Sequence, residues 1–220
     1  MAAALVVLGI LMFVLVGSVL GPVAGKRQSP IDAGSAKPDT MLAEAGGLRI
    51  STPIHPTGIT GLGYHPDGDS IIGMDPRGGN LSSNPISRLF TVGSNPEDIR
   101  YYVMSSAGRP GPSTGALDVE AKTGTITYAP VTGVITAIRP DPMLPDANVI
   151  EIKPAANPNL RVYVSLVKKI DSGVGVDSPV TAGKTALGSV ANSARVLHPQ
   201  LSSYTRNPGN HVTISVLSTN

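Results

Sequence analysis

Cysteine and tryptophan are both missing from this chain of 220 residues. The lack of cysteine excludes a disulfide framework, a thiolate zinc site and a cysteine nucleophile. Neither sign of charge is in large excess, because 17 basic and 15 acidic residues leave a formal net charge of only +2. Proteins that bind nucleic acid usually carry a strongly basic surface. We therefore expect no nucleic-acid partner.

Charged residues are absent from residues 1–25, which are mostly apolar. A helix of about 20 apolar residues spans the hydrocarbon core of a bilayer, which is about 30 Å thick. The composition therefore predicts a transmembrane helix or signal anchor over residues 1–25. A cleaved signal peptide remains an alternative, since residues 23–25 contain a small-x-small site. Against cleavage, no basic residue precedes the apolar run, which is longer than a usual signal core.

Aromatic residues make up only 4% of the chain, whereas glycine and proline contribute 25 and 20 residues. This composition favours short strands and turns over long helices. Residues 26–60 are small, polar and dotted with proline, so we expect a flexible stalk with one strand at Leu48–Ser51. Residues 61–110 are mixed in character. There we expect a short helix at 85–92, a strand at 99–104, and packing on the domain that follows.

Short apolar alternations recur between turn signals from about Pro112 onward. In residues 211–216, for example, every second residue is apolar, so the polar residues between them share the opposite face of a strand. About 110 residues are enough to bury one core. The pattern predicts a mostly β domain over 111–220, built as an antiparallel β-sandwich or barrel-like sheet. The predicted strands are 125–128, 132–138, 149–153, 160–166 and 211–216, with a short helix or ordered loop at 192–204.

Two local motifs suggest ligands, and a simpler explanation exists for each. Residues 182–185 read AGKT, but Ser178 stands where a phosphate-binding loop needs glycine, and no helix follows. Residues 65–69 offer one imidazole and two carboxylates, yet Asp-Gly in a loop usually forms a turn. The four histidines could bind zinc only if the fold brings them together; they are His55, His65, His198 and His211.

Five stretches of the C-terminal half follow one another in an order that can be compared with known families. They are GALDVEAKTGTITYAPVTGVITAI at 115–138, VIEIKP at 149–154, LRVYVSL at 160–166, VGVDSPVTAGKTALGSV at 174–190 and PGNHVTISV at 208–216. In this order they resemble the LytM/lysostaphin-like zinc endopeptidases, which have the duplicated-hybrid-motif fold. The resemblance covers roughly half of the chain. It implies the same fold for residues 111–220.

The resemblance also locates a site. The family binds zinc with the His and Asp of H-x-x-x-D and with the second His of H-x-H. Here Asp118 keeps the aspartate, but Thr114 and Thr213 occupy the two histidine positions. His211 matches the first, non-ligand histidine of H-x-H, and Ser165 stands where a further catalytic histidine is usual. Two of the three zinc ligands are therefore absent.

A catalytic zinc needs three protein ligands and an open fourth position. One carboxylate with two neutral hydroxyls is a poor zinc set. We therefore expect no catalytic residue, no metal and no cofactor, with Asp118 and His211 left as vestiges. The groove would survive as a polar binding surface, with these side chains: Thr114, Asp118, Ser165, His211, Thr213 and Ser215.

The expected function is a non-catalytic LytM-like domain of a bacterial cell envelope. It would bind peptidoglycan, or regulate a cell-wall hydrolase or an assembly partner. The alternative is an active zinc metalloendopeptidase of the cell wall, with His65 or His198 as a non-standard ligand. A lipoyl- or biotin-like carrier is disfavoured, because Lys153 precedes a proline and does not sit at a hairpin tip. An adhesion or assembly module is a further possibility.

Membrane orientation has two opposing indications. Lys26 and Arg27 follow the apolar segment, and the positive-inside tendency would keep that flank in the cytoplasm. The resemblance instead implies an extracytoplasmic C-terminal domain on a single-pass membrane anchor, which is the location we expect. One hypothesis that reconciles them is a translation start upstream, within a basic stretch.

Overall fold

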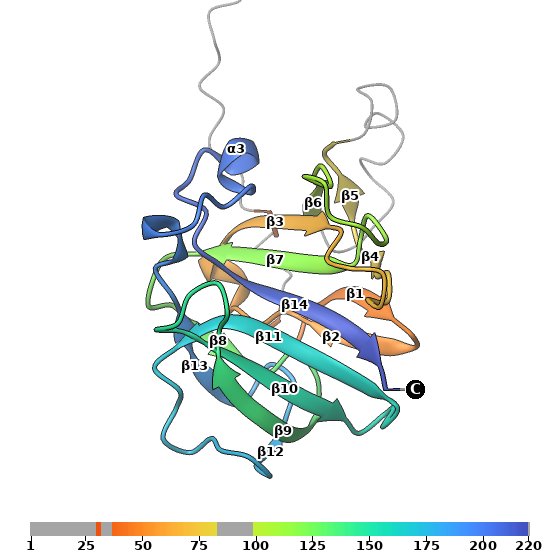
Figure 1. Ribbon diagram of the computed structural model, residues 1–220, viewed down its shortest axis with the longest axis vertical. Coiled ribbons are helices and arrows are strands. Elements are labelled where there is room, and N and C mark those ends of the chain that lie inside the picture. Colours follow the sequence, from red (N-terminus) through yellow and green to blue (C-terminus); the bar gives the residue numbers. More distant parts are fainter. Residues whose placement is uncertain (1–29, 32–36, 83–98, 220) are drawn as a thin grey trace, which may run out of the picture.

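Figure 1 shows the computed structural model, which describes residues 30–31, 37–82 and 99–219. Most of the described chain is β-strand, as the alternating pattern predicted. In chain order the elements are β1 (Met41–Ala45), β2 (Leu48–Ser51), η1 (Pro56–Gly58), β3 (Ile59–His65), β4 (Asp75–Pro76), β5 (Gly79–Asn80), β6 (Arg100–Val103), β7 (Ala116–Ala121), β8 (Ile126–Tyr128), β9 (Gly133–Pro140), β10 (Asn148–Pro154), β11 (Leu160–Lys168), β12 (Pro179–Val180), β13 (Ala186–Val190), η2 (Ser193–Arg195), α3 (Ser202–Thr205) and β14 (His211–Ser218).

One large sheet contains eleven of these strands. Its order is β12-β9-β10-β11-β14-β7-β3-β6-β5, and β13 pairs with β11 and β8. Nearly all neighbours are antiparallel, as expected, but β6 runs parallel to both β3 and β5. Parallel neighbours need a long crossover connection, and residues 66–99 lie between β3 and β6. The whole sheet is therefore mixed, but every strand pair within residues 111–220, where we expected an antiparallel sheet, is antiparallel.

A second, three-stranded sheet has the order β2-β1-β4. It lies behind β11 and β14 in Figure 1, and the two sheets share one hydrophobic core. Leu42 and Ile50 from the small sheet and Val119 and Ile214 from the large sheet belong to the same buried cluster. The N-terminal strands are thus part of the same folded body as the C-terminal ones.

Residues 37–60 lie within the segment that we expected to be a flexible stalk. Of that segment, only the strand at Leu48–Ser51 was anticipated, and it is β2. β1 pairs with β2 across Gly46 and Gly47, whose φ angles are +54° and +77°. A two-residue hairpin turn with positive φ at both positions is the turn that glycine pairs favour. That glycine pair is the hairpin signal that the stalk prediction overlooked.

The C-terminal strands follow the predicted alternation, and β6 falls within the strand expected at 99–104. The short helix or ordered loop expected at 192–204 is present as η2 and α3. Two predictions, the membrane helix over 1–25 and the helix at 85–92, fall outside the described residues. Within the described ranges, no helix has the length and apolar character needed to cross a membrane.

The two faces of β7 have different roles. Leu117, Val119 and Ala121 point into the core, whereas Asp118 and Glu120 point to the opposite face. α3 and the loops near it flank that opposite face on the β3 side (Figure 1), and the face carries the polar site described next.

Candidate functional site

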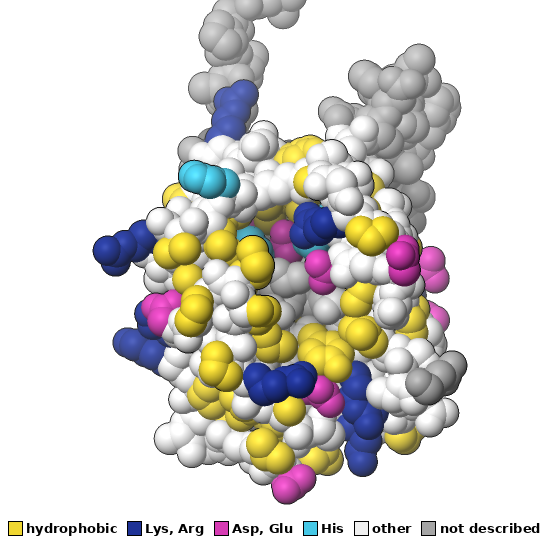
Figure 2. Space-filling view, in the orientation of Figure 1, with side chains coloured by type: hydrophobic (Ala, Val, Ile, Leu, Met, Phe, Trp, Pro, Cys, Tyr) yellow, Lys and Arg dark blue, Asp and Glu magenta, His cyan; other side chains and the backbone are white. Residues whose placement is uncertain are grey.

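Three strands place a row of polar side chains side by side. Thr213 on β14 pairs with Asp118 on β7 and, on its other side, with Ser165 on β11. His211 and Ser215 lie one step along β14 to either side, opposite Glu120 and Ala116. Figure 2 shows that this face is hollowed, with histidine and acidic side chains in the hollow and a basic side chain at its edge. We call this hollow the polar groove.

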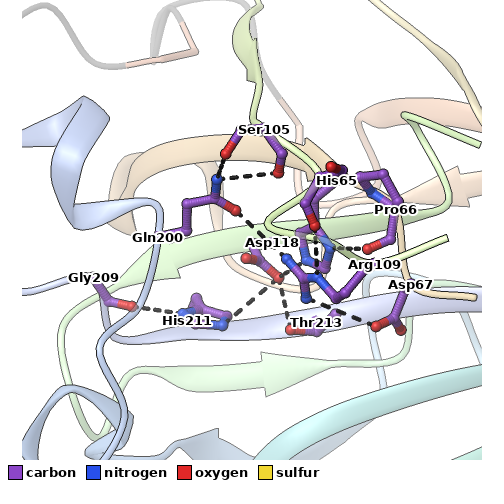
Figure 3. A network of polar contacts seen from close by, with 11 residues as sticks. His65, Pro66, Asp67, Ser105, Arg109, Asp118, Gln200, Gly209, His211 and Thr213 are labelled. Carbon is purple, nitrogen blue, oxygen red and sulfur yellow. Dashed lines mark hydrogen bonds and ion pairs between the residues drawn. The ribbon is translucent and has the colours of Figure 1, made fainter.

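Asp118 is the centre of the groove (Figure 3). Its Oδ1 atom accepts a hydrogen bond of 2.7 Å from the hydroxyl of Thr213. The Nε2 atoms of His65 and His211 lie 3.2 Å and 3.6 Å from the same oxygen. His65 comes from the end of β3, 53 residues earlier in the chain than Asp118. All three ionisable side chains are buried.

Backbone carbonyls orient both imidazole rings. The Nδ1 atom of His65 lies 2.9 Å from the carbonyl oxygen of Pro66, and Nδ1 of His211 contacts the carbonyl of Gly209. A carbonyl oxygen only accepts, so each Nδ1 carries the proton. His65 can therefore donate from Nε2 to Asp118 only when its ring is doubly protonated. The geometry favours an imidazolium–carboxylate pair.

The electrostatics of the groove agree with this pairing. Burial alone would lower the pKa of His65, but the hydrogen bond and charge of Asp118 outweigh burial and raise it. Burial alone would raise the pKa of Asp118. The attraction of His211 and His65 and the hydrogen bonds from His65 and Thr213 outweigh that effect. They hold the pKa of Asp118 well below its ordinary value, so this carboxylate is ionised at neutral pH.

Glu120 holds one wall of the groove in place. It is only 1% exposed, and its carboxylate accepts hydrogen bonds from Thr205 Oγ1 at 3.2 Å, Asn207 Nδ2 at 3.2 Å and the Gly209 amide at 2.9 Å. Gly209 in turn presents its carbonyl to His211. Glu120 therefore positions both the loop after α3 and the ring of His211.

Two glycines on β3 let this wall approach the sheet. A Cβ atom on Gly61 would lie 2.6 Å from both the Glu120 carboxylate and the Thr205 methyl group. A Cβ atom on Gly63 would lie 2.8 Å from Met104 and 2.9 Å from Leu201. Real Cβ atoms do not come this close to other atoms, so a side chain at either position would push the wall outward.

The opposite rim carries Arg109. Its guanidinium lies 3.9 Å from the Asp67 carboxylate and donates to the side-chain oxygen of Gln200 at 3.5 Å. Gln200 also donates to the backbone carbonyl of Ser105 at 3.1 Å and contacts its hydroxyl. These residues form a polar bridge between the loop before α3 and the loop after β6 (Figure 3). Burial raises the pKa of Asp67 despite the nearby charges of His65 and Arg109.

The sequence-based site residues are only partly assembled. Asp118, Ser165, His211, Thr213 and Ser215 share the groove face. Thr114 lies before β7, and its backbone carbonyl accepts a hydrogen bond from the Met74 amide. Of the two histidines considered as substitutes, His65 joins Asp118, whereas His198 is exposed.

Sequence reasoning did not assign roles to Glu120 and Arg109. Glu120 follows Asp118 at a spacing of two, which places both carboxylates on one face of a strand and could have signalled its place. Arg109 lies in a loop without periodicity, and no sequence pattern indicates its position.

The zinc implied by the family resemblance can be tested against these residues. The hydroxyl of Thr213 donates a hydrogen bond to Asp118, so at this ligand position the side chain acts as a hydrogen-bond donor. Thr114 offers a second neutral hydroxyl, which is also a poor zinc ligand. No group of three or more His, Cys, Asp or Glu side chains within the described ranges is arranged to hold a metal ion. Because threonine stands at two of its three ligand positions, the family's zinc set does not fit this site.

Comparisons with known proteins add similarities in structure only. No family model and no curated protein matches the chain. Csd3 of Helicobacter pylori matches 51% of this chain and 25% of its own, with 18% identity and a TM-score of 0.35. A zinc-containing peptidase of Vibrio cholerae matches 51% of this chain and 29% of its own, with 19% identity and a TM-score of 0.35.

A third similarity is to the SpoIIQ–SpoIIIAH pore-forming complex, with 47% of this chain and 56% of that chain covered, 19% identity and a TM-score of 0.33. This chain spans only about a quarter of the Csd3 chain. Similarities at TM-scores this low say nothing about the function of this chain.

Proposed function

We propose that this chain is a LytM-like domain of the bacterial cell envelope, with the duplicated-hybrid-motif fold, that binds its ligand in the polar groove without cleaving it. One observation carries the proposal. The Thr213 hydroxyl donates a 2.7 Å hydrogen bond to Asp118, at the position where the active family has a zinc-binding histidine. The ordered resemblance over residues 111–220 supports the kind of domain.

The chemistry of the groove supports binding over hydrolysis. Peptide hydrolysis in this family depends on a metal that activates water and polarises the amide carbonyl. In this groove the negative charge of Asp118 is instead paired with His65, and its carboxylate accepts a hydrogen bond from Thr213. The hydroxyls of Ser165 and Ser215 face the same groove and can donate to or accept from a peptide or a sugar.

The proposed ligands are peptidoglycan itself, or an envelope protein such as a cell-wall hydrolase or an assembly partner. The proposed location is a single-pass membrane anchor at residues 1–25, with residues 26–220 outside the cytoplasm. Because the chain has no cysteine, a single Val196→Cys variant would show directly on which side of the membrane the domain lies. Val196 is 61% exposed. A membrane-impermeant maleimide should label it in intact spheroplasts, and labelling only after lysis would contradict this orientation.

Binding without cleavage can be tested on the full chain in detergent. After incubation with a zinc salt and gel filtration, elemental analysis should find no stoichiometric zinc. The same protein should sediment with purified peptidoglycan or with an envelope partner. On cell-wall zymograms it should produce no clearing.

The active zinc endopeptidase remains the second candidate, because His65 does lie 3.2 Å from Asp118. Stoichiometric zinc together with clearing on the zymogram would establish it and reject the binding proposal. In that case both properties should be lost in His65→Ala and His211→Ala. His55→Ala is the matched control, because His55 is exposed and its ring hydrogen-bonds the hydroxyl of Thr57, away from Asp118.

A further inference from the structure

The guanidinium of Arg109 has unused hydrogen-bonding capacity. Its three contacts are Nε to the Ser106 carbonyl at 3.5 Å, Nη2 to Gln200 at 3.5 Å and Nη1 to Asp67 at 3.9 Å. Well-formed N–H···O bonds are about 2.7–3.2 Å long. A guanidinium also carries five donors in a planar fork that fits a carboxylate with two parallel bonds. No contact of Arg109 within the described residues has that short, paired form.

Arg109 also lies where a ligand in the groove would meet it. Its side chain is 39% exposed, and in Figure 3 it extends over the buried cluster around Asp118. The two other basic groups of the cluster, His65 and His211, both already lie against Asp118. Asp67, the acidic neighbour of Arg109, is 36% exposed and lies at the outer limit of an ion pair. Arg109 is therefore the accessible positive charge of the groove with the least committed partner.

The groove face beside Asp118 also carries groups that suit the rest of a peptide. The register places Ser165 beside Thr213 and Ser215 beside Tyr163. No hydrogen bond joins the hydroxyls of Ser165 and Ser215 to another described residue; Ser165 is half-buried, and Ser215 is 8% exposed. They remain available to the amide groups of a bound chain.

We propose that Arg109 recognises a free carboxylate of the peptide that binds in the polar groove. This inference rests on the proposed binding function and names the ligand class of the same site. The ligand carboxylate displaces Asp67 and Gln200 from Arg109 and forms two short charge-assisted hydrogen bonds. The peptide backbone then lies across β14, over Ser215 and Ser165.

A matched pair of small peptides tests the proposal. The probes are N-acetyl-dialanine with a free carboxylate and the same peptide as its C-terminal amide, titrated into the full chain by calorimetry or NMR. The free acid should bind about tenfold more tightly or better, because a charge-assisted paired bond replaces a neutral one. Equal affinity for the two peptides, or binding of neither at millimolar concentration, would overturn the proposal.

Variants identify the residue responsible. Arg109→Gln should abolish the preference for the free acid, and Arg109→Lys should retain only part of it, because an ammonium lacks the planar fork. Arg139→Gln is the control: Arg139 is an exposed arginine on β9, which β10, β11 and β14 separate from β7. Arg139→Gln should keep the full preference. If Arg109→Gln still preferred the free acid over the amide, another residue would be the one that binds the ligand carboxylate.

The outcomes also separate this inference from the proposed function. Sedimentation with peptidoglycan without any preference for the free acid would reject the role of Arg109 and leave the binding function standing. Zinc-dependent clearing of cell walls would reject binding without cleavage, whatever the peptides show.

Discussion

At the scale of single residues, Asp118 and His65 tie stability to pH. The pKa of Asp118 is lowered in the folded state. The contribution of Asp118 to the free energy of unfolding is therefore present above its unfolded pKa of about 3.9. It is lost as pH falls through the folded pKa. The pKa of His65 is raised. The contribution of His65 to the free energy of unfolding is complete below its unfolded pKa of about 6.5. It is lost as pH rises through the folded pKa.

We therefore expect the free energy of unfolding to fall as pH rises from about 6 toward alkaline values. In Asp118→Asn this slope should flatten, because the raised pKa of His65 depends on the carboxylate. Urea denaturation at a series of pH values measures the slope, and the imidazole NMR signals of His65 report its pKa directly. His198→Ala, at an exposed position, should keep the parental slope. An unchanged slope in Asp118→Asn would contradict the ion pair.

Thr213 and Thr127 provide a matched pair of substitutions. Thr213→Val removes the hydrogen bond to a buried, ionised carboxylate, and we expect a loss of about 1.5–3 kcal/mol in the free energy of unfolding. Among the described residues, the buried Thr127 hydroxyl has no hydrogen-bond partner, so Thr127→Val should be neutral or stabilise by about 1 kcal/mol. Chemical denaturation of both variants checks the contrast. Equal effects would mean that the Thr213 bond adds no stability.

At the scale of elements, a bulge near the end of β11 positions one side of the groove. Leu166 adopts a φ of +62°, which is uncommon for a residue with a side chain. Its amide donates to Asp141 Oδ2 at 3.0 Å. The other oxygen of Asp141 accepts from the amides of Met143 and Leu144 at 2.9 Å and 3.2 Å. Asp141 thus ties the β9–β10 connection to the strand that carries Ser165.

Asp141→Ala should therefore destabilise the chain by about 2–4 kcal/mol, because three backbone amides lose a charged acceptor. Asp146→Ala is the control, since Asp146 is 60% exposed and its ion pair is with Lys168 at the surface. Exposed pairs of this kind contribute less than about 1 kcal/mol. Thermal or urea unfolding distinguishes the two. A similar small loss in both would show that the bulge does not depend on Asp141.

At the scale of the whole molecule, the N-terminal strands and the C-terminal domain share one core. β3 lies between β6 and β7 in the large sheet. Leu42, Ile50 and Ile54 are each fully buried in the common cluster. Residues 37–60 are thus required to cover the face of the sheet opposite the polar groove.

Two truncations test this requirement. A chain starting at residue 30 should unfold cooperatively, whereas a chain starting at residue 61 should not. The second loses β1, β2 and buried side chains worth about 1.5–3 kcal/mol each, which is large against a typical total of 5–15 kcal/mol. Circular dichroism melting and gel filtration compare them. A sharp transition in the shorter chain, at the temperature of the longer one, would show that residues 30–60 are dispensable.

The sequence alone determined the features that depend on near neighbours. Alternation with a period of two located β10, β11 and β14, and it placed His211, Thr213 and Ser215 on one face. The same local reasoning missed the hairpin at Gly46 and Gly47, whose signal is two residues long.

Only the tertiary structure decided which distant residues meet. His65 reaches Asp118 across 53 positions, and Arg109 meets Gln200 across 91. Such contacts depend on the order of strands in the sheet and on how loops fold over its face. A periodic pattern specifies which way a side chain points, but not which strand lies beside it, because hydrogen bonding between strands uses backbone groups that every sequence shares.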